Sequence, residues 1–400
     1  MRVLINLVGK QQQPNTLATL HVRPDAIVQV CKGDDYLPQI DHFETHCHET
    51  LGVSRFFILK LRLQSFAMAQ SEEDALMRRI TRWQRELHAQ KVAAGALAAD
   101  AEEPVEILVN LTGGTKLMAV ALQQLALKNG HRCLYVDDKA ILDSENGRFP
   151  LPDMTLSDLI GPMGYVFRSE APDLSASDVG ALWAIHQSDP RGYGLFCEWI
   201  RINEVGLTVF DCTPRWDKAL MERLCAAGFL TCTPTETQDR YDIVFLRPEV
   251  LGVLRLHGLV LELALLQVMV QVQARLEAPL RLYPNVKIRH RTSPDNGFTD
   301  ESEFDLVAVC EGRVFFFECK ITPKGEKVAQ MLDGFLTNTA RYGGASANRI
   351  LVRPHPYRDR NLEVKADNRR IQLLGIGDLQ DEGLLQRLMR YMLKPDRGMV

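Results

Sequence analysis

The chain has 400 residues, of which 46% are hydrophobic and 24% are charged, a mixture typical of a soluble globular protein. This length is sufficient for two or three domains that each bury a core. The formal net charge of −4 gives no overall basic excess, so any binding of nucleic acid would need a local patch.

Cysteine usage and hydropathy indicate a cytoplasmic protein. The nine cysteines form no C-x-x-C pair, which favours reduced thiols over a disulfide scaffold. The apolar N-terminus is too short for a signal peptide. The longest apolar run, residues 259–274, contains Glu262 and three glutamines, so it is too short and too polar to span a bilayer. We therefore expect no membrane segment.

The first 150 residues alternate between strand-like and helix-like segments. A helix is expected at 71–94, with Ser71 as its N-cap, and another at 118–129, closed by Gly130. Strands are expected at 3–8, 26–31, 56–63, 105–111 and 133–136. This alternation predicts an α/β fold with a parallel, Rossmann-like sheet.

The pattern changes after residue 150. Residues 151–175 are rich in Pro, Gly, Asp and Ser and are expected to form a linker. From 177 to about 250, two helical stretches precede two strand-like segments, which suggests a small winged-helix unit. An α+β linker with no binding role fits this pattern equally well.

The C-terminal part begins with an expected helix at 254–277. Three strands follow, and Glu311-Gly312-Arg313 forms a tight hairpin turn between the last two. A further helix is expected to end near Tyr342. The strands are expected at 285–290, 304–309, 314–320 and, after the last helix, 349–352.

Three charged residues stand out in this part: Asp305, Glu318 and Lys320. A tight hairpin makes their two strands antiparallel, so both carboxylates reach the same end of the sheet. Glu318 and Lys320 lie two apart and share a face. Carboxylates are ligands of Mg²⁺ or Mn²⁺, which would activate water, and the lysine would stabilise developing negative charge. A buried ion cluster without catalytic use explains the pattern equally well.

The arrangement D-x12-E-C-K after a helix that carries an acid resembles the PD-(D/E)xK nuclease superfamily. The resemblance implies that Asp305, Glu318 and Lys320 form the catalytic core and that Glu262 completes the metal ligands with Asp305 and Glu318. The proline of the motif is absent, because Phe304 precedes Asp305.

Basic residues precede this motif. Lys287, Arg289 and Arg291 alternate along one strand and so form a stripe. Such a stripe attracts phosphate backbones. A solvated face of an edge strand explains it as well.

Two polar loops follow strands of the N-terminal sheet. The first includes Val8 to Asn15, and the second is the turn from Thr112 to Lys116, which contains Gly113 and Gly114. Both lie at the carboxyl edge of a parallel sheet, where ligands bind, and a Gly-rich turn before a helix exposes N–H groups to anions. The turn lacks the spacing of a Walker A motif, and glycine here also serves plain helix packing.

The motifs NLV-x-x-Q-x-x-PN and N-x-TGGTK-x-M resemble those of a CARF domain, and the whole chain resembles the CARF nucleases of type III CRISPR systems. This resemblance implies a homodimer that is activated by cyclic oligoadenylate, cyclic tetra-adenylate above all. It places the activator contacts on the following residues: Val8, Gly9, Lys10, Gln11, Asn15, Thr112, Gly113, Gly114, Thr115 and Lys116.

The expected organisation has three parts: residues 1–155 form the CARF sensor, 156–250 a linker and winged-helix-like region, and 251–400 the restriction-endonuclease-like PD-(D/E)xK domain. The expected function is a metal-dependent nuclease acting on DNA, RNA or both in antiviral defence. The alternative is a transcription regulator that senses a cyclic nucleotide and binds DNA through the winged helix.

Overall fold

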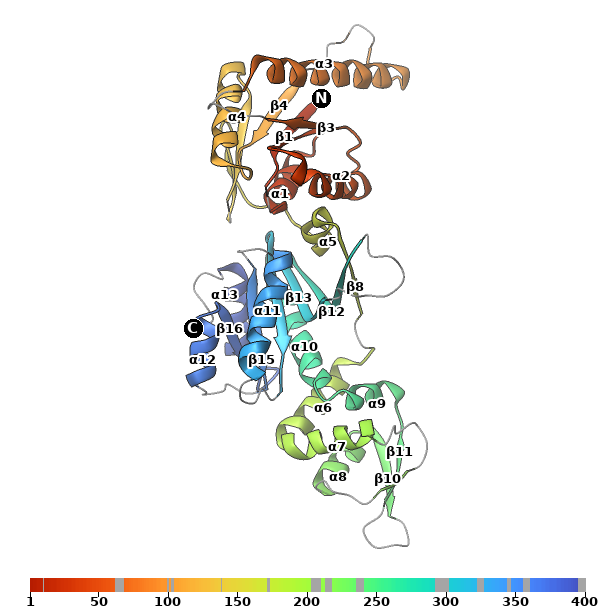
Figure 1. Ribbon diagram of the computed structural model, residues 1–400. Helices are drawn as coiled ribbons and strands as arrows, with labels where there is room; N and C mark the ends of the chain where they lie inside the picture. The colour runs from red at the N-terminus through yellow and green to blue at the C-terminus, as the bar shows by residue number, and fades with distance from the viewer. Residues whose placement is uncertain are drawn as a thin grey trace.

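The computed structural model has three parts along its length (Figure 1). The N-terminal domain lies at one end, the C-terminal domain lies in the middle, and the segment between them in sequence lies at the other end. The structure describes residues 1–9, 11–61, 68–98, 101, 104–137, 139–170, 173–202, 210–212, 218–234, 241–291, 302–321, 327–343, 347–354 and 360–394.

The N-terminal domain contains a sheet in the order β3-β2-β1-β4-β5-β6-β7. Its first five strands in that order are parallel, and β6 and β7 add an antiparallel end. The predicted Rossmann-like sheet is therefore confirmed. The strands are β1 (Arg2–Leu7), β2 (Ala26–Cys31), β3 (Phe56–Lys60), β4 (Glu106–Asn110), β5 (Arg132–Val136), β6 (Ile141–Asp143) and β7 (Gly147–Phe149).

Helices cover both faces of this sheet, which explains why its central strands are buried and mostly apolar. Helices α1 (Gln13–Val22) and α2 (Leu37–Leu51) pack on one face. Helices α3 (Gln70–Ala93) and α4 (Lys116–Asn129) pack on the other. The expected start of α3 was wrong, because its N-cap is Ala69 rather than Ser71.

The C-terminal domain contains a mixed sheet in the order β16-β15-β14-β13-β12-β8. Strands β8, β12, β13 and β14 pair antiparallel with their neighbours, and β14, β15 and β16 pair parallel. The hairpin turn lies where the sequence predicted it, with positive φ at Glu311 (47°) and Gly312 (70°), as a two-residue type I′ turn requires. The strands are β8 (Tyr165–Ser169), β12 (Leu280–His290), β13 (Ser302–Cys310), β14 (Arg313–Cys319), β15 (Asn348–Arg353) and β16 (Ile371–Gly375).

Helices also cover both faces of the C-terminal sheet. Helices α10 (Leu259–Arg275) and α13 (Glu382–Leu393) contact the face that carries Phe315 and Phe317. Helices α11 (Lys327–Gly343) and α12 (Arg360–Asp367) contact the face that carries Phe316. An N-terminal α/β domain with a mainly parallel sheet, followed by an α/β domain with a mixed sheet, matches the predicted fold class.

The expected linker at 151–175 needs a correction, because part of it is a strand of the C-terminal sheet. Strand β8 pairs with β12 from Ser169 opposite Val286 to Tyr165 opposite His290. Before it come α5 (Leu156–Ile160) and the 3-10 helix η2 (Gly161–Met163). Since β8 lies outside β12, the basic stripe on β12 does not belong to an edge strand.

The region between the two domains in sequence contains helices and a small antiparallel sheet in the order β10-β11-β9, and its winged-helix-like character stays a prediction. Its apolar core is continuous with that of α10 and the C-terminal sheet. The expected boundary at residue 250 therefore marks a change in sequence pattern, but the residues on its two sides share one core. The elements are α6 (Ala176–Ser188), α7 (Pro190–Ile202), β9 (Phe210–Cys212), α8 (Lys218–Ala226), β10 (Leu230–Pro234) and β11 (Tyr241–Phe245).

The single helix expected at 254–277 is two helices, α9 (Pro248–Arg255) and α10, which meet at an angle of 112°. Among the described helices, none alone has the length and apolar character to cross a membrane, and only this bent pair passes that test of length and composition when joined.

The N-terminal domain contacts the hairpin turn of the C-terminal domain. The Gln13 side chain donates a 2.8 Å hydrogen bond to the Gly312 carbonyl. A Cβ atom at Gly312 would lie 3.2 to 3.3 Å from atoms of Leu151 and Leu17, so glycine allows this close approach. A second link is the 2.8 Å ion pair between Arg291 and Glu49. The turn of the β13–β14 hairpin is thus tied to the N-terminal domain.

Candidate functional site

The acidic residues of the C-terminal motif lie side by side at one end of the β13–β14 hairpin. The pairing of these strands extends to Leu306 opposite Phe317, so Asp305 and Glu318 are the next pair outward. The backbone N–H of Cys319 donates a 2.5 Å hydrogen bond to Asp305 Oδ2. The hairpin therefore fixes the carboxyl group of Asp305 against the end of β14.

Lys320 follows β14 directly and faces the same cluster. Its Nζ lies 2.7 Å from Glu318 Oε1, and the two side chains are 40% and 19% exposed. The Lys320 backbone N–H donates to the Val352 carbonyl of β15 at 3.0 Å, which holds this residue in line with the sheet. Burial lowers the pKa of Lys320, but Glu318 and Asp305 together raise it above its usual value, so the ammonium group stays charged.

Glu262 joins this cluster from the first turn of α10. Burial first and the nearby Asp305 second raise the pKa of Glu262, which reaches about 8 although Lys320 lowers it. Burial likewise raises the pKa of Asp305 to about 7, with Glu318 as the next cause. These mutual effects show that the structure brings all four residues of the predicted catalytic set into one electrostatic cluster.

The donor set fits a hard divalent cation, because it consists of carboxylate oxygens that repel one another when ionised. Asp305 and Glu318 are the adjacent pair, and Glu262 approaches from the helix. Within the described residues, however, no three His, Cys, Asp or Glu side chains form a complete set of metal ligands as they stand. The metal-ligand roles of Glu262, Asp305 and Glu318 therefore stay predictions.

The basic stripe on β12 is partly engaged in ion pairs. Lys287 Nζ lies 3.9 Å from Glu303 Oε1, and Arg291 pairs with Glu49 of α2. Lys287 also stands opposite Arg168 of β8, which widens the positive strip across two strands. These positions allow the basic side chains of β12 to contact a phosphate backbone, and they also allow them to hold the N-terminal domain, as Arg291 does through Glu49.

The predicted activator turn in the N-terminal domain is built on two glycines in left-handed conformation, Gly113 (φ 102°) and Gly114 (φ 59°). A Cβ at Gly113 would lie 2.8 Å from the Leu7 carbonyl oxygen, and a Cβ at Gly9 would lie 2.9 Å from the Gly114 nitrogen. The loops after β1 and β4 therefore touch backbone to backbone. The two predicted motifs therefore lie together at the switch point of the sheet, between β1 and β4.

Buried amide side chains hold these loops. Asn110 donates to Asn6 Oδ1 and Asn15 Oδ1, both at 3.1 Å. Asn15 donates to the Leu7 carbonyl at 3.0 Å and to Gln12 Oε1 at 3.1 Å. The Thr112 backbone N–H in turn donates to Asn110 Oδ1 at 3.0 Å. This network joins β1, α1 and β4.

The predicted contact residues divide by exposure. Val8 and Asn15 are buried, at 2% and 1% exposed, so their side chains shape the loops instead of facing solvent. Lys10 lies outside the described residues. Thr112 and Gly9 are half-buried, and the Thr112 hydroxyl accepts a 2.6 Å hydrogen bond from the Val136 N–H. The exposed members are Gln11, Gly113, Gly114, Thr115 and Lys116.

The exposed end of the turn begins helix α4. Thr115 is its N-cap, and the hydroxyl oxygen accepts from the Met118 N–H at 3.3 Å. Lys116 is the first helical residue. Unpaired N–H groups of a first helical turn attract anions, and the lysine adds a full charge.

Three further buried side chains lie outside the predicted contact set, namely Asn6, Gln12 and Asn110, which are 0%, 2% and 0% exposed. Their roles are supportive, since they hold the backbone of the turn in place. A signal for them existed, because asparagine inside the apolar strands RVLINL and EILVN is unusual.

Comparison with known proteins gives matches by structure alone, since no protein-family model and no curated protein matches the chain. Can2 from Sulfobacillus thermosulfidooxidans, solved in complex with cyclic tetra-adenylate, is 17% identical with a TM-score of 0.66 over 98% of this chain and 99% of its own. Protein VC1899 from Vibrio cholerae is 15% identical with a TM-score of 0.73 over 98% of both chains. The likeness shows that these proteins share one fold over their full lengths.

Proposed function

We propose that this chain is a metal-dependent nuclease that hydrolyses phosphodiester bonds in DNA or RNA and that a cyclic oligoadenylate switches it on. The observation that carries the proposal is the cluster of Glu262, Asp305, Glu318 and Lys320 at one end of the C-terminal sheet. Activation by a cyclic oligoadenylate is supported by the fold that the chain shares, over 98% of its length, with a protein solved in complex with cyclic tetra-adenylate. The setting would be type III CRISPR antiviral defence.

Asp305 and Glu318 would hold Mg²⁺ or Mn²⁺, with Glu262 as a further ligand. Such an ion polarises a phosphoryl oxygen and lowers the pKa of bound water. Lys320 keeps its charge beside Glu318 and would stabilise the negative charge that develops on the phosphate. Strand β12 and its basic residues would attract the substrate backbone.

The activator would bind at the joined loops after β1 and β4. Its phosphates suit the N–H groups and Lys116 at the start of α4, and its repeated units suit a two-fold site between two copies of the chain. The Gln13–Gly312 hydrogen bond links the start of α1, directly after the first loop, to the hairpin that would carry the catalytic residues. A ligand shifts the equilibrium only if it binds the active arrangement more tightly.

The test is a cleavage assay on single- and double-stranded DNA and RNA, with and without cyclic tetra- or hexa-adenylate. We expect cleavage only with activator and Mg²⁺ or Mn²⁺, and we expect EDTA to stop it. Cleavage that survives exhaustive chelation would contradict the metal site. Activator-dependent DNA binding without cleavage in any metal would favour the transcription regulator instead.

A further inference from the structure

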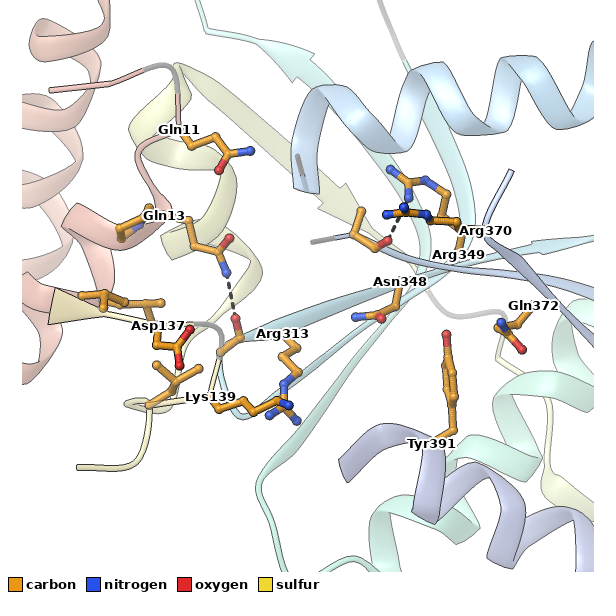
Figure 2. Close-up of a pocket in the computed structure, with 16 residues that line it drawn as sticks. Gln11, Gln13, Asp137, Lys139, Arg313, Asn348, Arg349, Arg370, Gln372 and Tyr391 are labelled. Carbon is orange, nitrogen blue, oxygen red and sulfur yellow. Dashed lines mark hydrogen bonds between the residues drawn. The ribbon is translucent and has the colours of Figure 1, made fainter. Parts of the chain in front are cut away.

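A cavity of about 670 Å³ lies between the N-terminal and C-terminal domains (Figure 2). One wall comes from α1 and the loop after β5, and the other comes from the hairpin turn, the starts of β15 and β16, and α13. The hydrogen bond from Gln13 to the Gly312 carbonyl crosses it near one side. The volume lies within the usual range of sites for small molecules.

Cationic side chains dominate this cavity. Arg313, Arg349 and Arg370 line the C-terminal wall, and Lys139 lines the N-terminal wall, against a single carboxylate, Asp137. Neutral polar groups complete the lining, among them the amides of Asn348 and Gln372 and the hydroxyl of Tyr391. Arg313 also pairs with Glu311 at 3.5 Å, and the positive charge that remains in the lining favours an anionic ligand.

Arg349 is the strongest indication, because it is a cation that is only 6% exposed. Its Nε donates to Thr339 Oγ1 at 2.6 Å and its Nη1 donates to the Ala347 carbonyl at 3.0 Å, which fixes the guanidinium plane. Burial lowers its pKa, and the neighbouring Arg370 lowers it further. Arg349 is thus fixed near a second arginine, and an anion bound between them would offset their repulsion.

This cavity is distinct from the catalytic cluster. Arg313 begins β14 and Cys319 ends it, so the cavity and the acidic residues lie at opposite ends of a seven-residue strand. Those ends are roughly 20 Å apart. On the sensor side, Gln11 of the loop after β1 reaches the cavity, so a ligand here would contact both domains.

We propose that this cavity binds the phosphate groups of a ligand of nucleotide size, held by Arg313, Arg349 and Arg370 from one domain and Lys139 from the other. Arginine matches the geometry of phosphate oxygens, and lysine adds a point charge. The phosphates can come from a separate nucleotide or from the cyclic activator itself. The inference does not depend on nuclease activity.

The experiment measures binding of two probes, ADP and cyclic tetra-adenylate, by calorimetry in metal-free buffer. The proteins are the full-length wild type, Arg370→Gln, Lys139→Gln and the control Lys365→Gln. Lys365 is exposed on α12 and lies outside the cavity, so the control loses the same charge. Loss of one charge-assisted contact should lower the affinity for a probe about ten-fold, and the control should bind as tightly as the wild type.

The outcomes separate the sources of phosphate. Weaker binding of ADP alone in both cavity variants assigns the cavity to a separate nucleotide, and weaker binding of cyclic tetra-adenylate extends the activator into it. If ADP binds in the cavity while cyclic tetra-adenylate binds nowhere, the inference stands and the proposed activation fails. Failure of both probes to bind the wild type, or equal affinities in all four proteins, would overturn the inference. Because the two variants alter opposite walls, misfolding of one leaves the other as the test.

Discussion

At the N-terminal turn the buried polar groups are neutral, and the Asn110 amide donates hydrogen bonds to the side-chain oxygens of Asn6 and Asn15. At the end of β14 the polar groups are acids, and burial together with mutual repulsion raises the pKa of Glu262 to about 8 and of Asp305 to about 7. Neutral networks are stable without a ligand, whereas crowded carboxylates are not. The N-terminal turn is therefore held in place by its own contacts, whereas a bound cation, as proposed above, would relieve the repulsion within the acidic cluster.

The largest effect should come from the acidic cluster. Glu318→Gln should reduce cleavage by about 10²-fold or more, because it removes a carboxylate central to charge stabilisation in the transition state. Folding and activator binding should not change. The control Glu363→Gln alters an exposed carboxylate on α12 and should cleave normally. A wild-type rate in Glu318→Gln would remove this residue from the catalytic site.

Lys116→Ala should weaken activator binding by roughly ten- to a hundred-fold per protomer, as expected for one charge-assisted contact. In a symmetric dimer two copies would face one ring, so the loss could be larger. Lys128→Ala is the matched control, since Lys128 lies in the last turn of the same helix and pairs with Glu73. Direct titration of labelled cyclic tetra-adenylate measures both. Equal affinities of the two variants for the activator would show that the turn with Lys116 is not part of the activator site.

Gly113→Ala should destabilise the N-terminal domain by about 2–3 kcal/mol, because the new Cβ combines a left-handed conformation with a clash against Leu7. Gly147→Ala has a similar φ of 85° but meets no atom within 4 Å, so about 1 kcal/mol is expected there. Urea denaturation compares the two. Equal losses would show that the loops do not need their close approach.

The acidic cluster should also make stability depend on pH when metal is absent. A carboxyl group whose pKa rises from 4.5 unfolded to about 8 folded binds more protons in the folded state between those values. The free energy of unfolding therefore falls as the pH rises through this window. Glu262→Gln should be more stable than the wild type at pH 8, on the order of 1–2 kcal/mol, and the gap should shrink at pH 5. Thermal denaturation in EDTA measures this gap, and a gap independent of pH would contradict the account.

Local patterns in the sequence were sufficient for much of the fold. The turn at Glu311 and Gly312 was predictable because a two-residue hairpin needs positive φ at both positions. Helix α1 was missed because it is buried on several sides, with Asn15, Thr16 and Thr19 among its buried residues, and so has little amphipathic periodicity.

Non-local contacts explain what the sequence did not predict. Strand β8 was taken for a linker because its partner, β12, is more than a hundred residues away in the chain. The meeting of Asp305 and Glu318 was predictable from their spacing on a hairpin, whereas Glu262 was assigned only by the family resemblance. The amide network of Asn6, Asn15 and Asn110 joins three elements and has no such local spacing.

The central claim is that activation and chemistry reside in separate sites, and one titration tests it most directly. The rate of cleavage is measured against cyclic tetra-adenylate concentration for the wild type, Lys116→Ala and Glu318→Gln. The account predicts that Lys116→Ala needs more activator but recovers much of the wild-type rate at saturation, while Glu318→Gln stays inactive at every concentration. An unchanged half-maximal concentration in Lys116→Ala, or recovery of cleavage by Glu318→Gln at high activator, would contradict it.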